Sequence, residues 1–411
     1  MKTTTVKGTR DYLPAEAQLR GFIQNRILET YREAGFNQII TPILEDIDNL
    51  LGSEGGDNLN LMFKVLKRGG KLESAAAGGK LDSLADIGLR YDLTLPLSRY
   101  YANNRAKLVF PMKCIQIGNA YRAENPQRGR YREFVQCDID ILGVSKPWAE
   151  AELITTTAKA LTDLGIGDFR VRINNRQILS GLFLAFGFAE KDIPGLCVSF
   201  DKLDKIGADG VAEEIGRKGF ASDACAKLIE FINEKDYSLE KCVGLIGESE
   251  DTESVKSIIE AVNSLADGQY SCDFDITLVR GQGYYTGAVF EIESLAYSGS
   301  LAGGGRYDNL IGKFIGEKVP AVGFSIGFER IFDLLSSQGF TIPDSKPQIA
   351  VFFGDDYAGA YKAACGLKEN YSVSIFEKPK KLGKFLDTLE KEGCAGYFVA
   401  GQSDEVKLFG E

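Results

Sequence analysis

Chemistry-bearing side chains concentrate in one stretch of this 411-residue chain, between Gly118 and Gly143. Two segments with alternating patterns, residues 117–124 and 133–142, flank a polar loop and are predicted to pair as a β-hairpin. Because successive side chains point to opposite faces of a strand, alternate residues of the second segment share one face. That face carries an aromatic ring, an amide and two carboxylates: Phe134, Gln136, Asp138 and Asp140.

Arginines occur in and beside the loop of this hairpin. Arg122 and Glu124 share a face of the first segment, and the loop holds Arg128, Arg130 and Arg132. A guanidinium suits a phosphate group because its planar fork stays charged and donates hydrogen bonds in pairs. The polar face is unsuited to a core and suited to binding a charged small molecule. An exposed hairpin with a solvated arginine loop fits the same composition, so the pattern alone leaves both interpretations open.

The chain contains no histidine. Mechanisms that need an imidazole are therefore excluded, including Ser-His-Asp and Cys-His hydrolysis, histidine-ligated zinc and a histidine general base. The eight cysteines include no Cys-x-x-Cys pair, which argues against a zinc ribbon or a redox motif. Any chemistry must rest on arginines, carboxylates, tyrosines and metal-bound phosphate.

The composition is that of an ordinary soluble globular enzyme, with 44% hydrophobic and 26% charged residues. The first residues lack the apolar core of a signal peptide, and no apolar run approaches a membrane span. We therefore expect a cytoplasmic protein with no membrane partner. The net charge of −10 disfavours general nucleic-acid binding, so any RNA contact must use local basic patches.

Hydrophobic spacing and turn-forming residues predict the elements that position these side chains. Apolar residues at helical spacing predict a helix over Ala15–Glu33, and a strand is predicted to follow over Gln38–Leu44. Residues 52–58 and 69–85 are rich in Gly, Ser, Ala and Lys. They are predicted as loops around a short strand at Leu61–Leu66.

Farther along, a helix over Ala149–Leu164 and a strand over Phe169–Ile173 are predicted to precede a helical block at about 175–265. Asp344–Pro347 has the composition of a linker. Beyond it, strand-like and helix-like segments alternate to Leu408, which predicts a small parallel α/β domain.

The hairpin closely resembles motif 2 of class II aminoacyl-tRNA synthetases, in the form carried by the histidyl-tRNA synthetase family. Other segments resemble the family's motifs in the same order over roughly residues 7–335. Gly35–Pro42 resembles motif 1, Val279–Thr286 the histidine-binding signature and Val322–Arg330 motif 3. The other matching segments are Lys7–Pro14, Leu89–Pro96 and Gly303–Asp308.

The resemblance implies an α+β fold, in which an antiparallel-sheet catalytic domain carries a helical insertion and a small C-terminal α/β domain follows. The catalytic core would comprise residues 1–174 and 266–343, with the insertion at 175–265. Residues 344–411 would form an anticodon-binding-like domain, although this segment is short for that role. The motif 1 match implies a homodimer.

The implied function is ATP-dependent activation of L-histidine to histidyl-adenylate and transfer to tRNA(His). Magnesium would bridge ATP phosphate oxygens, and no residue is assigned as a metal ligand. The alternative is the inert synthetase paralogue that acts as regulatory subunit of ATP phosphoribosyltransferase in histidine biosynthesis. The arginines kept at the motif positions favour the enzyme, whereas Gly283, in place of an acidic residue, and the short C-terminal segment favour the paralogue.

The resemblance also implies roles for individual residues. Three arginines would be catalytic: Arg122, Arg280 and Arg330. The ATP site would comprise Arg122, Glu124, Arg130, Phe134 and Arg330. The histidine site would comprise Asp92, Thr94, Gln136, Asp140, Arg280, Tyr284, Tyr285 and Tyr307. The tRNA acceptor end would contact Gln127, Arg128 and Arg130. Asn125 departs from an arginine common in the family near that acceptor end.

Overall fold

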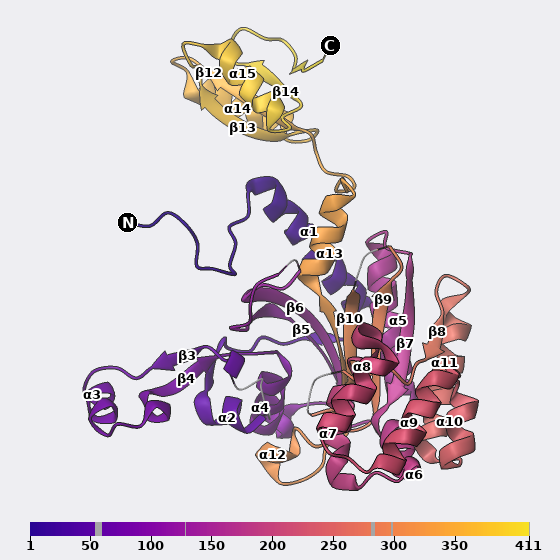
Figure 1. Ribbon diagram of the computed structural model, residues 1–411. Helices are drawn as coiled ribbons and strands as arrows, with labels where there is room; N and C mark the ends of the chain where they lie inside the picture. Colours follow the sequence, from indigo (N-terminus) through magenta and orange to yellow (C-terminus); the bar gives the residue numbers. More distant parts are fainter. Residues whose placement is uncertain (54–59, 128, 281–283, 297–298, 411) are drawn as a thin grey trace. The chain divides into compact units, whose positions relative to one another are not determined.

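The computed structural model describes residues 1–53, 60–127, 129–280, 284–296 and 299–410 (Figure 1). The chain divides into two compact units, Met1–Gly339 and Phe340–Glu411. Each unit has a sheet and a hydrophobic core of its own. Across the described residues, no helix combines the length and the apolar character needed to cross a membrane.

An eight-stranded sheet forms the centre of the first unit, in the order β1-β5-β6-β11-β10-β9-β7-β8. In that order the strands are β1 (Asn37–Gln38), β5 (Met112–Tyr121), β6 (Glu133–Leu142), β11 (Ala321–Gly327), β10 (Ser300–Arg306), β9 (Ala288–Ser294), β7 (Phe169–Asn175) and β8 (Cys272–Phe274). All neighbours from β5 to β7 are antiparallel, and only the short edge strands β1 and β8 pair in parallel. This arrangement confirms the predicted α+β class.

Helices cover one face of this sheet. The helix α1 (Pro14–Glu33) packs on β5, β6 and on α5 (Trp148–Asp163), which also contacts β10 and β11. From α1 the apolar side chains at helical spacing are buried here: Leu19, Ile23, Ile27 and Tyr31. Both helices occupy nearly the predicted residues. The opposite face of β6, which carries the polar side chains, is left to line a cavity.

The predicted hairpin is confirmed as β5 and β6, with Tyr121 paired to Glu133 at its loop end. Strand β5 starts at Met112, earlier than predicted, and it ends at Tyr121, just before Arg122. The strand predicted over 38–44 was wrong as one element. Its beginning lies in β1, whereas β2 (Leu44–Asp46) belongs to a separate sheet with β4 (Ala85–Leu89) and β3 (Lys64–Leu66). Pro42 lies between them and has no N–H to donate to a ladder.

The loop predicted at 69–85 was also wrong. It contains the helix α3 (Gly70–Ala77), a 3₁₀ turn at Leu81–Leu84 and the start of β4. Residues 71–77 are mostly strong helix formers, and the helix forms although none of its residues is fully buried. The loop predicted at 52–58 overlaps the end of α2 (Ile47–Ser53), and its remainder lies outside the described residues.

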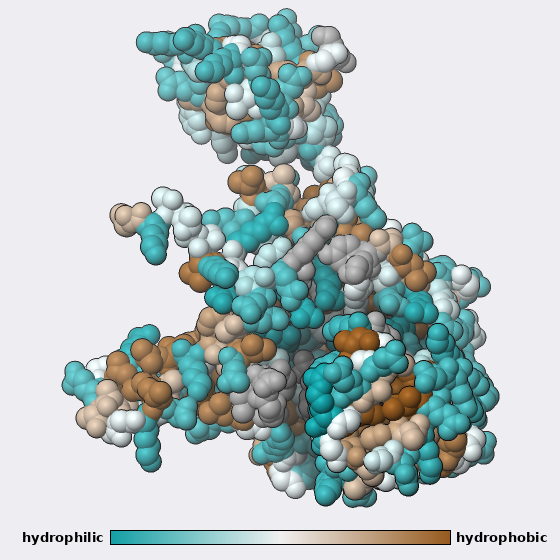
Figure 2. All heavy atoms as spheres, viewed as in Figure 1, coloured by the Kyte–Doolittle hydropathy of each residue, from teal (hydrophilic) through white to brown (hydrophobic). Residues whose placement is uncertain are grey.

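The predicted helical block is confirmed. It consists of α6 (Arg176–Phe186), α7 (Ile193–Phe200), α8 (Leu203–Arg217), α9 (Ser222–Glu234), α10 (Leu239–Ile246) and α11 (Glu250–Ala266). Its interior is aromatic, with Phe183 edge-on to both Phe188 and Phe200. In Figure 2 the region of this block shows hydrophilic residues surrounding a hydrophobic patch. The remaining helices of the first unit are α4 (Thr94–Asn104), α12 (Gly312–Ile315) and α13 (Phe328–Ser337).

The second unit is the predicted small α/β domain. Its elements are β12 (Gln348–Phe353), α14 (Tyr357–Leu367), β13 (Ser372–Glu377), α15 (Leu382–Lys391), β14 (Gly396–Val399) and β15 (Lys407–Leu408). Three strands pair in parallel in the order β13-β12-β14, and β15 adds an antiparallel edge. Alternation along β12 separates two cores, since Phe352 packs with α15 and Val351 with α14.

A buried ion pair ties the helical layer to the sheet. Arg306 of β10 donates from Nε to Glu150 Oε1 of α5 at 2.6 Å and from Nη1 to the carbonyl oxygen of Val144 at 2.8 Å. The side chains of Glu150 and Arg306 are only 2% and 11% exposed. Without Glu150, the buried Arg306 would keep, among the described residues, only the carboxylate of Asp308, whose Oδ1 lies 3.3 Å from Nη1 and which is more exposed.

We therefore expect Glu150→Ala to lower the free energy of unfolding by about 3–5 kcal/mol. The matched control is Glu213→Ala, which removes the pair between Glu213 and Arg217 on the surface of α8, where both side chains are largely exposed. That change should cost about 0–1 kcal/mol. Urea unfolding followed by circular dichroism measures both, and equal losses would contradict a special role for the buried pair.

Candidate functional site

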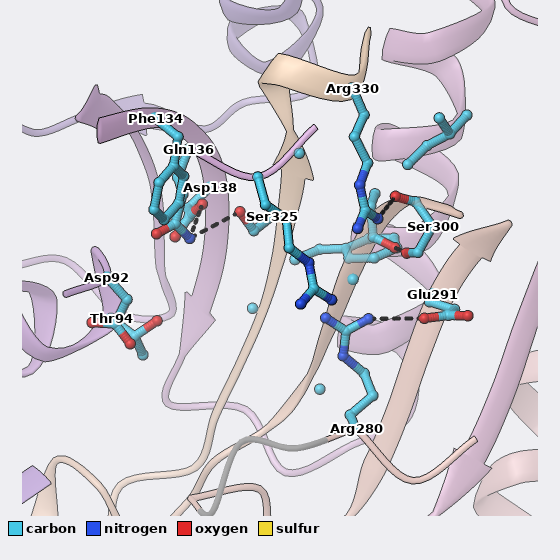
Figure 3. Close-up of a pocket in the computed structure, with 18 of the residues that line it drawn as sticks. Asp92, Thr94, Phe134, Gln136, Asp138, Arg280, Glu291, Ser300, Ser325 and Arg330 are labelled. Atoms are coloured by element: carbon cyan, nitrogen blue, oxygen red, sulfur yellow. Dashed lines mark hydrogen bonds and ion pairs between the residues drawn. The ribbon is translucent and has the colours of Figure 1, made fainter. Parts of the chain in front are cut away.

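A cavity of about 750 Å³ lies over the open face of the central sheet. This is within the range of small-molecule sites. Its lining comes from β6, β10 and β11, from the starts of α4 and α13, from residues 277–280 before β9, and from Asp201 and Lys205 of the helical block. Figure 3 shows Phe134, Gln136 and Asp138 on one wall, Arg280 and Glu291 on another, and Arg330 above them.

The structure gathers nearly all of the predicted site residues around this cavity. Those that line it are Asp92, Thr94, Arg122, Glu124, Arg130, Phe134, Gln136, Asp140, Arg280, Tyr284, Tyr285, Tyr307 and Arg330. Gln127 is not part of the lining. It forms a tight turn with Arg130, whose backbone N–H donates to the Gln127 carbonyl oxygen at 2.8 Å. Arg128 and Gly283 lie outside the described residues.

Strand pairing explains why β6 forms a polar wall. One set of alternate side chains, Val135, Cys137, Ile139 and Ile141, is buried, and the other set faces the cavity. The register with β11 places Gly323 opposite Asp140. A Cβ on Gly323 would lie 2.0 Å from Asp140 Oδ1, so glycine is required for the carboxylate to lie across β11.

Arg122 extends into the cavity just beyond the end of β5. Its Nε donates to the carbonyl oxygen of Tyr91 at 3.2 Å. Its guanidinium lies 4.3 Å from the ring centre of Tyr91 and 5.1 Å from that of Phe134. Such contacts hold a cation in place without neutralising it. Within the described ranges no carboxylate forms an ion pair with Arg122, so its charge is available to an anionic ligand.

Arg280 is held at both its backbone and its side chain. Its φ is +42°, a left-handed conformation that costs a residue other than glycine about 1–3 kcal/mol. Arg176 donates from Nη2 to the Arg280 carbonyl oxygen at 2.8 Å, and Arg280 donates from Nη1 to Glu291 Oε2 at 3.1 Å. Glu291 in turn accepts from Arg172 Nη1 at 3.2 Å. These contacts make the position of the Arg280 guanidinium well defined (Figure 3).

The start of α13 brings Arg330 to the cavity. Arg330 donates from Nη1 to the carbonyl oxygen of Ser300. The preceding residue, Glu329, is buried and accepts from both Nη atoms of Arg20, at 2.6 and 2.9 Å. Glu329 also accepts from the backbone N–H of Val135 at 3.1 Å. The beginning of α13 is thereby fixed to α1 and to β6.

Acidic and phenolic groups occupy the other end of the cavity. Asp140 accepts from the Tyr307 hydroxyl at 2.6 Å, and Tyr284 lies 3.5 Å from Asp92 Oδ2 through its hydroxyl. Burial raises the pKa of Asp92, raises the pKa of Asp140 to about 7, and raises that of Asp138 well above its usual range. Carboxylates in this environment favour a ligand that carries N–H donors or positive charge.

Several residues of the site had no assigned role on sequence grounds. Asp138 belongs to the same alternating face as Gln136 and Asp140, and this alternation in the sequence could have identified it as a site residue. Ser325 and Glu329 lie inside the segment that resembles motif 3. Glu291, which pairs with Arg280, and Arg172, which pairs with Glu291, could not be identified from the sequence, because they belong to β9 and β7 and lie outside the matched segments.

The raised pKa of Asp140 predicts a pH-dependent stability. This carboxyl has an ordinary pKa of 3.8 and a pKa of about 7 in the folded protein. Between these values the folded state binds more protons than the unfolded state, so stability falls as pH rises. Asp140→Asn keeps the shape and removes the titrating proton. The melting temperature of the variant relative to wild type should therefore be higher at about pH 8 than at about pH 5.

The matched control for this comparison is Asp82→Asn, since the Asp82 side chain is 93% exposed. Its melting temperature relative to wild type should be the same at both pH values. Thermal melts followed by circular dichroism measure all three proteins. Parallel pH profiles for wild type and Asp140→Asn would contradict the assignment of a high pKa to Asp140.

Known proteins of one family match this chain along most of its length. The family described as histidyl-tRNA synthetase matches residues 8–331. The histidine–tRNA ligase of Leifsonia xyli is 43% identical over 357 residues, which cover 83% of this chain and 82% of that protein. The histidine–tRNA ligase of Christiangramia forsetii is 34% identical and covers 98% of this chain and 93% of its own length.

Solved structures agree in fold. The histidyl-tRNA synthetase from Nostoc sp. PCC 7120 is 28% identical, with a TM-score of 0.78 over 97% of this chain and 91% of that one. A protein from Bacillus halodurans, described as an ATP phosphoribosyltransferase regulatory subunit/histidyl-tRNA synthetase, is 21% identical with a TM-score of 0.78, over 98% of this chain and 100% of that one. That likeness concerns the fold alone. From the family match and the identity to its members, the chain belongs to the histidyl-tRNA synthetase family.

Proposed function

We propose that the protein activates L-histidine with ATP to form histidyl-adenylate and then transfers the histidyl group to tRNA(His). The observation that carries this proposal is the distribution of charge in the cavity. Arg122, Arg280 and Arg330 line the same cavity as the buried carboxylates of Asp92 and Asp140. Figure 3 shows Arg280 and Arg330 across the cavity from Asp92. Histidine and ATP together present the complementary groups.

Activation requires the histidine carboxylate to attack the α-phosphorus of ATP while pyrophosphate leaves. Both reactants are negatively charged, so the enzyme must hold them together and stabilise the charge that develops on the α-phosphate oxygens. Arg122 reaches the cavity from the end of β5 and Arg280 from the segment before β9. These two guanidiniums can bind the α-phosphate from opposite walls, and Arg122 can also bind the attacking carboxylate.

The ATP would lie along the β6 wall, with its adenine on the Phe134 ring and near Glu124. The Glu124 carboxylate Oε2 lies 3.8 Å from Arg130 Nη1. Arg330, fixed by its contact with Ser300, would bind the terminal phosphate. Magnesium would arrive with ATP on its phosphate oxygens, as is usual for this ion.

Histidine would bind at the acidic end of the cavity. Asp140 and the tyrosines around it suit the imidazole ring, and Asp92, Thr94 and Gln136 suit the α-ammonium group. A pocket that makes hydrogen bonds to both ring nitrogens rejects amino acids without them, because its buried polar groups would lose their partners. This would give the enzyme its specificity for histidine.

Two assembly features belong to the same proposal. Three apolar side chains in or just before β2 are exposed in the single chain, namely Ile40 (87%), Ile43 (41%) and Leu44 (53%). A second copy of the chain would cover them in a cytoplasmic homodimer. The tRNA acceptor end would contact Gln127 and Arg130, which form a tight backbone turn. The α/β unit at Phe340–Glu411 would contact the anticodon region.

Histidine-dependent exchange of labelled pyrophosphate into ATP, without tRNA, tests the activation step. We expect exchange with histidine alone among the amino acids. Arg280→Ala should lower kcat by about 10²–10³-fold, because it removes a cation from the transition state. The control Arg217→Ala changes an exposed arginine of α8 and should leave exchange intact.

Histidine binding without exchange in the wild-type protein would contradict the synthetase proposal. It would favour the regulatory role in ATP phosphoribosyltransferase, which shares the fold. The direct check is stimulation of that enzyme by the purified protein.

Gly303→Ala tests whether Arg280 must lie flat on β10. A Cβ at this position would lie 1.8 Å from Arg280 Nη1, so the guanidinium must move. We expect exchange to fall by at least about tenfold, within the range for a misplaced transition-state donor. Gly244→Ala in α10 is the matched control, because no atom lies within 4 Å of its added Cβ. Equal exchange rates for both variants would contradict the positioning argument.

A further inference from the structure

Asp138 is a buried carboxylate that the assigned roles do not use. It lies on the cavity face of β6, between Gln136 and Asp140, and is 4% exposed. No lysine or arginine among the described residues forms an ion pair with it. A buried carboxylate without a cationic partner is costly, so its presence in a ligand cavity requires a physical explanation.

The groups around Asp138 hold it in place and leave its charge uncompensated. Ser325 lies opposite it in the pairing of β6 with β11 and hydrogen-bonds to its carboxylate. Gln136 Nε2 donates to Ser325 Oγ at 3.2 Å and lies 3.5 Å from Asp138 Oδ1 (Figure 3). Among the charged groups that act on it, Asp140 and Asp92 repel it, whereas Arg122 and Arg90 attract it without forming an ion pair.

A second observation indicates what this part of the cavity binds. The Oε1 atom of Gln136 is enclosed, yet it accepts no hydrogen bond from any described residue. Its Nε2 is already engaged by Ser325 and Asp138, so the acceptor end of the amide remains for a ligand. A buried acceptor without a donor is rare in proteins and points to a missing N–H or O–H group.

A primary ammonium group has three N–H donors and no acceptor. This part of the cavity offers three acceptors, namely Asp92, Asp138 and Gln136 Oε1. We propose that Asp138 is a direct ligand of the α-ammonium group of the amino-acid substrate and completes a three-acceptor site with Asp92 and Gln136. The inference rests on the proposed activation of histidine and adds a residue to its binding site.

The alternative target for Asp138 is the imidazole ring. The position of Asp138 along β6 favours the ammonium group. Asp140, which is assigned to the imidazole ring, lies two residues farther on, about 6–7 Å away along the strand. Asp140 is also the carboxylate that the Tyr307 hydroxyl contacts. Charge also favours the ammonium group as the partner of Asp138. Near neutral pH the ammonium group is fully charged, whereas an imidazole with an ordinary pKa is mostly neutral.

Two ligands separate these possibilities. L-Histidine carries the ammonium group, whereas 3-(imidazol-4-yl)propionate has the same ring and carboxylate without it. Calorimetric titration without ATP gives the Kd of each. We expect Asp138→Asn to raise the Kd of histidine by about 10- to 100-fold, the range for a lost charged hydrogen bond, and that of imidazolepropionate by less than about threefold.

Asp140→Asn is the matched control, because it changes a second buried aspartate on the same face of β6. It should weaken both ligands to a similar degree. Ser325→Ala removes a hydrogen bond to Asp138 without touching the carboxylate. It should weaken histidine by about two- to fivefold and leave imidazolepropionate unchanged, and it keeps the test valid if Asp138→Asn fails to fold.

Equal weakening of both ligands by Asp138→Asn would overturn the proposal in favour of ring binding or a structural role. Unchanged affinity for histidine would overturn it as well. Calorimetry also separates this inference from the proposed function. Wild-type protein that binds histidine without catalysing exchange contradicts the function alone, whereas normal histidine affinity in Asp138→Asn contradicts the inference alone.

Discussion

The antiparallel pairing of β5, β6 and β11 is the constraint on which the site depends. Because β6 lies between two strands, its register is set on both sides, and a slip of one residue would turn its carboxylates into the helical layer. The buried apolar residues Val135, Cys137 and Ile139 hold this register against α1 and α5. The polar wall of the cavity therefore follows from packing on the opposite face of the same strand.

This wall has an electrostatic consequence. Burial raises the pKa values of Asp92, Asp138 and Asp140, and repulsion from neighbouring carboxylates raises those of Asp138 and Asp140 further. Arg122, Arg280 and Arg330 face the same cavity from other elements. Bound together, a ligand with an ammonium group and a ligand with a triphosphate would compensate the charges of the aspartates and of the arginines. Binding of such ligands would offset the electrostatic cost of burying these charged groups.

Arg280 and Arg330 are positioned by partners that lie outside the matched motifs. Glu291 holds Arg280 and is itself held by Arg172, so a strand pair far from the hairpin fixes that guanidinium. Arg20 on α1 binds Glu329, which also accepts from the backbone of Val135. Helix α1 thereby connects the start of α13 to β6. Preorganisation of this kind is what lets a charged group stabilise a transition state without moving.

Local pattern determined the elements whose signal was periodic. The helix α1, the hairpin of β5 and β6, the helical block and the alternating C-terminal unit could all be predicted, because hydrophobic spacing reports burial directly. Hydrophobic spacing gave wrong predictions where burial did not determine the secondary structure. The helix α3 has no fully buried residue, and the break between β1 and β2 depends on Pro42 and on which sheet each segment joins.

The residues of the site divide in the same way. Their types and their alternation along β6, together with the family resemblance, identified from the sequence alone many of the polar and aromatic residues that line the cavity. Tertiary structure alone decided their partners. The contact of Arg280 with Glu291, the enclosure of Gln136 Oε1 and the burial of Asp138 among other carboxylates depend on strands that are distant in sequence. Sequence spacing reports which side chains share a face, whereas charge compensation depends on what lies across the cavity, and only the folded chain determines that.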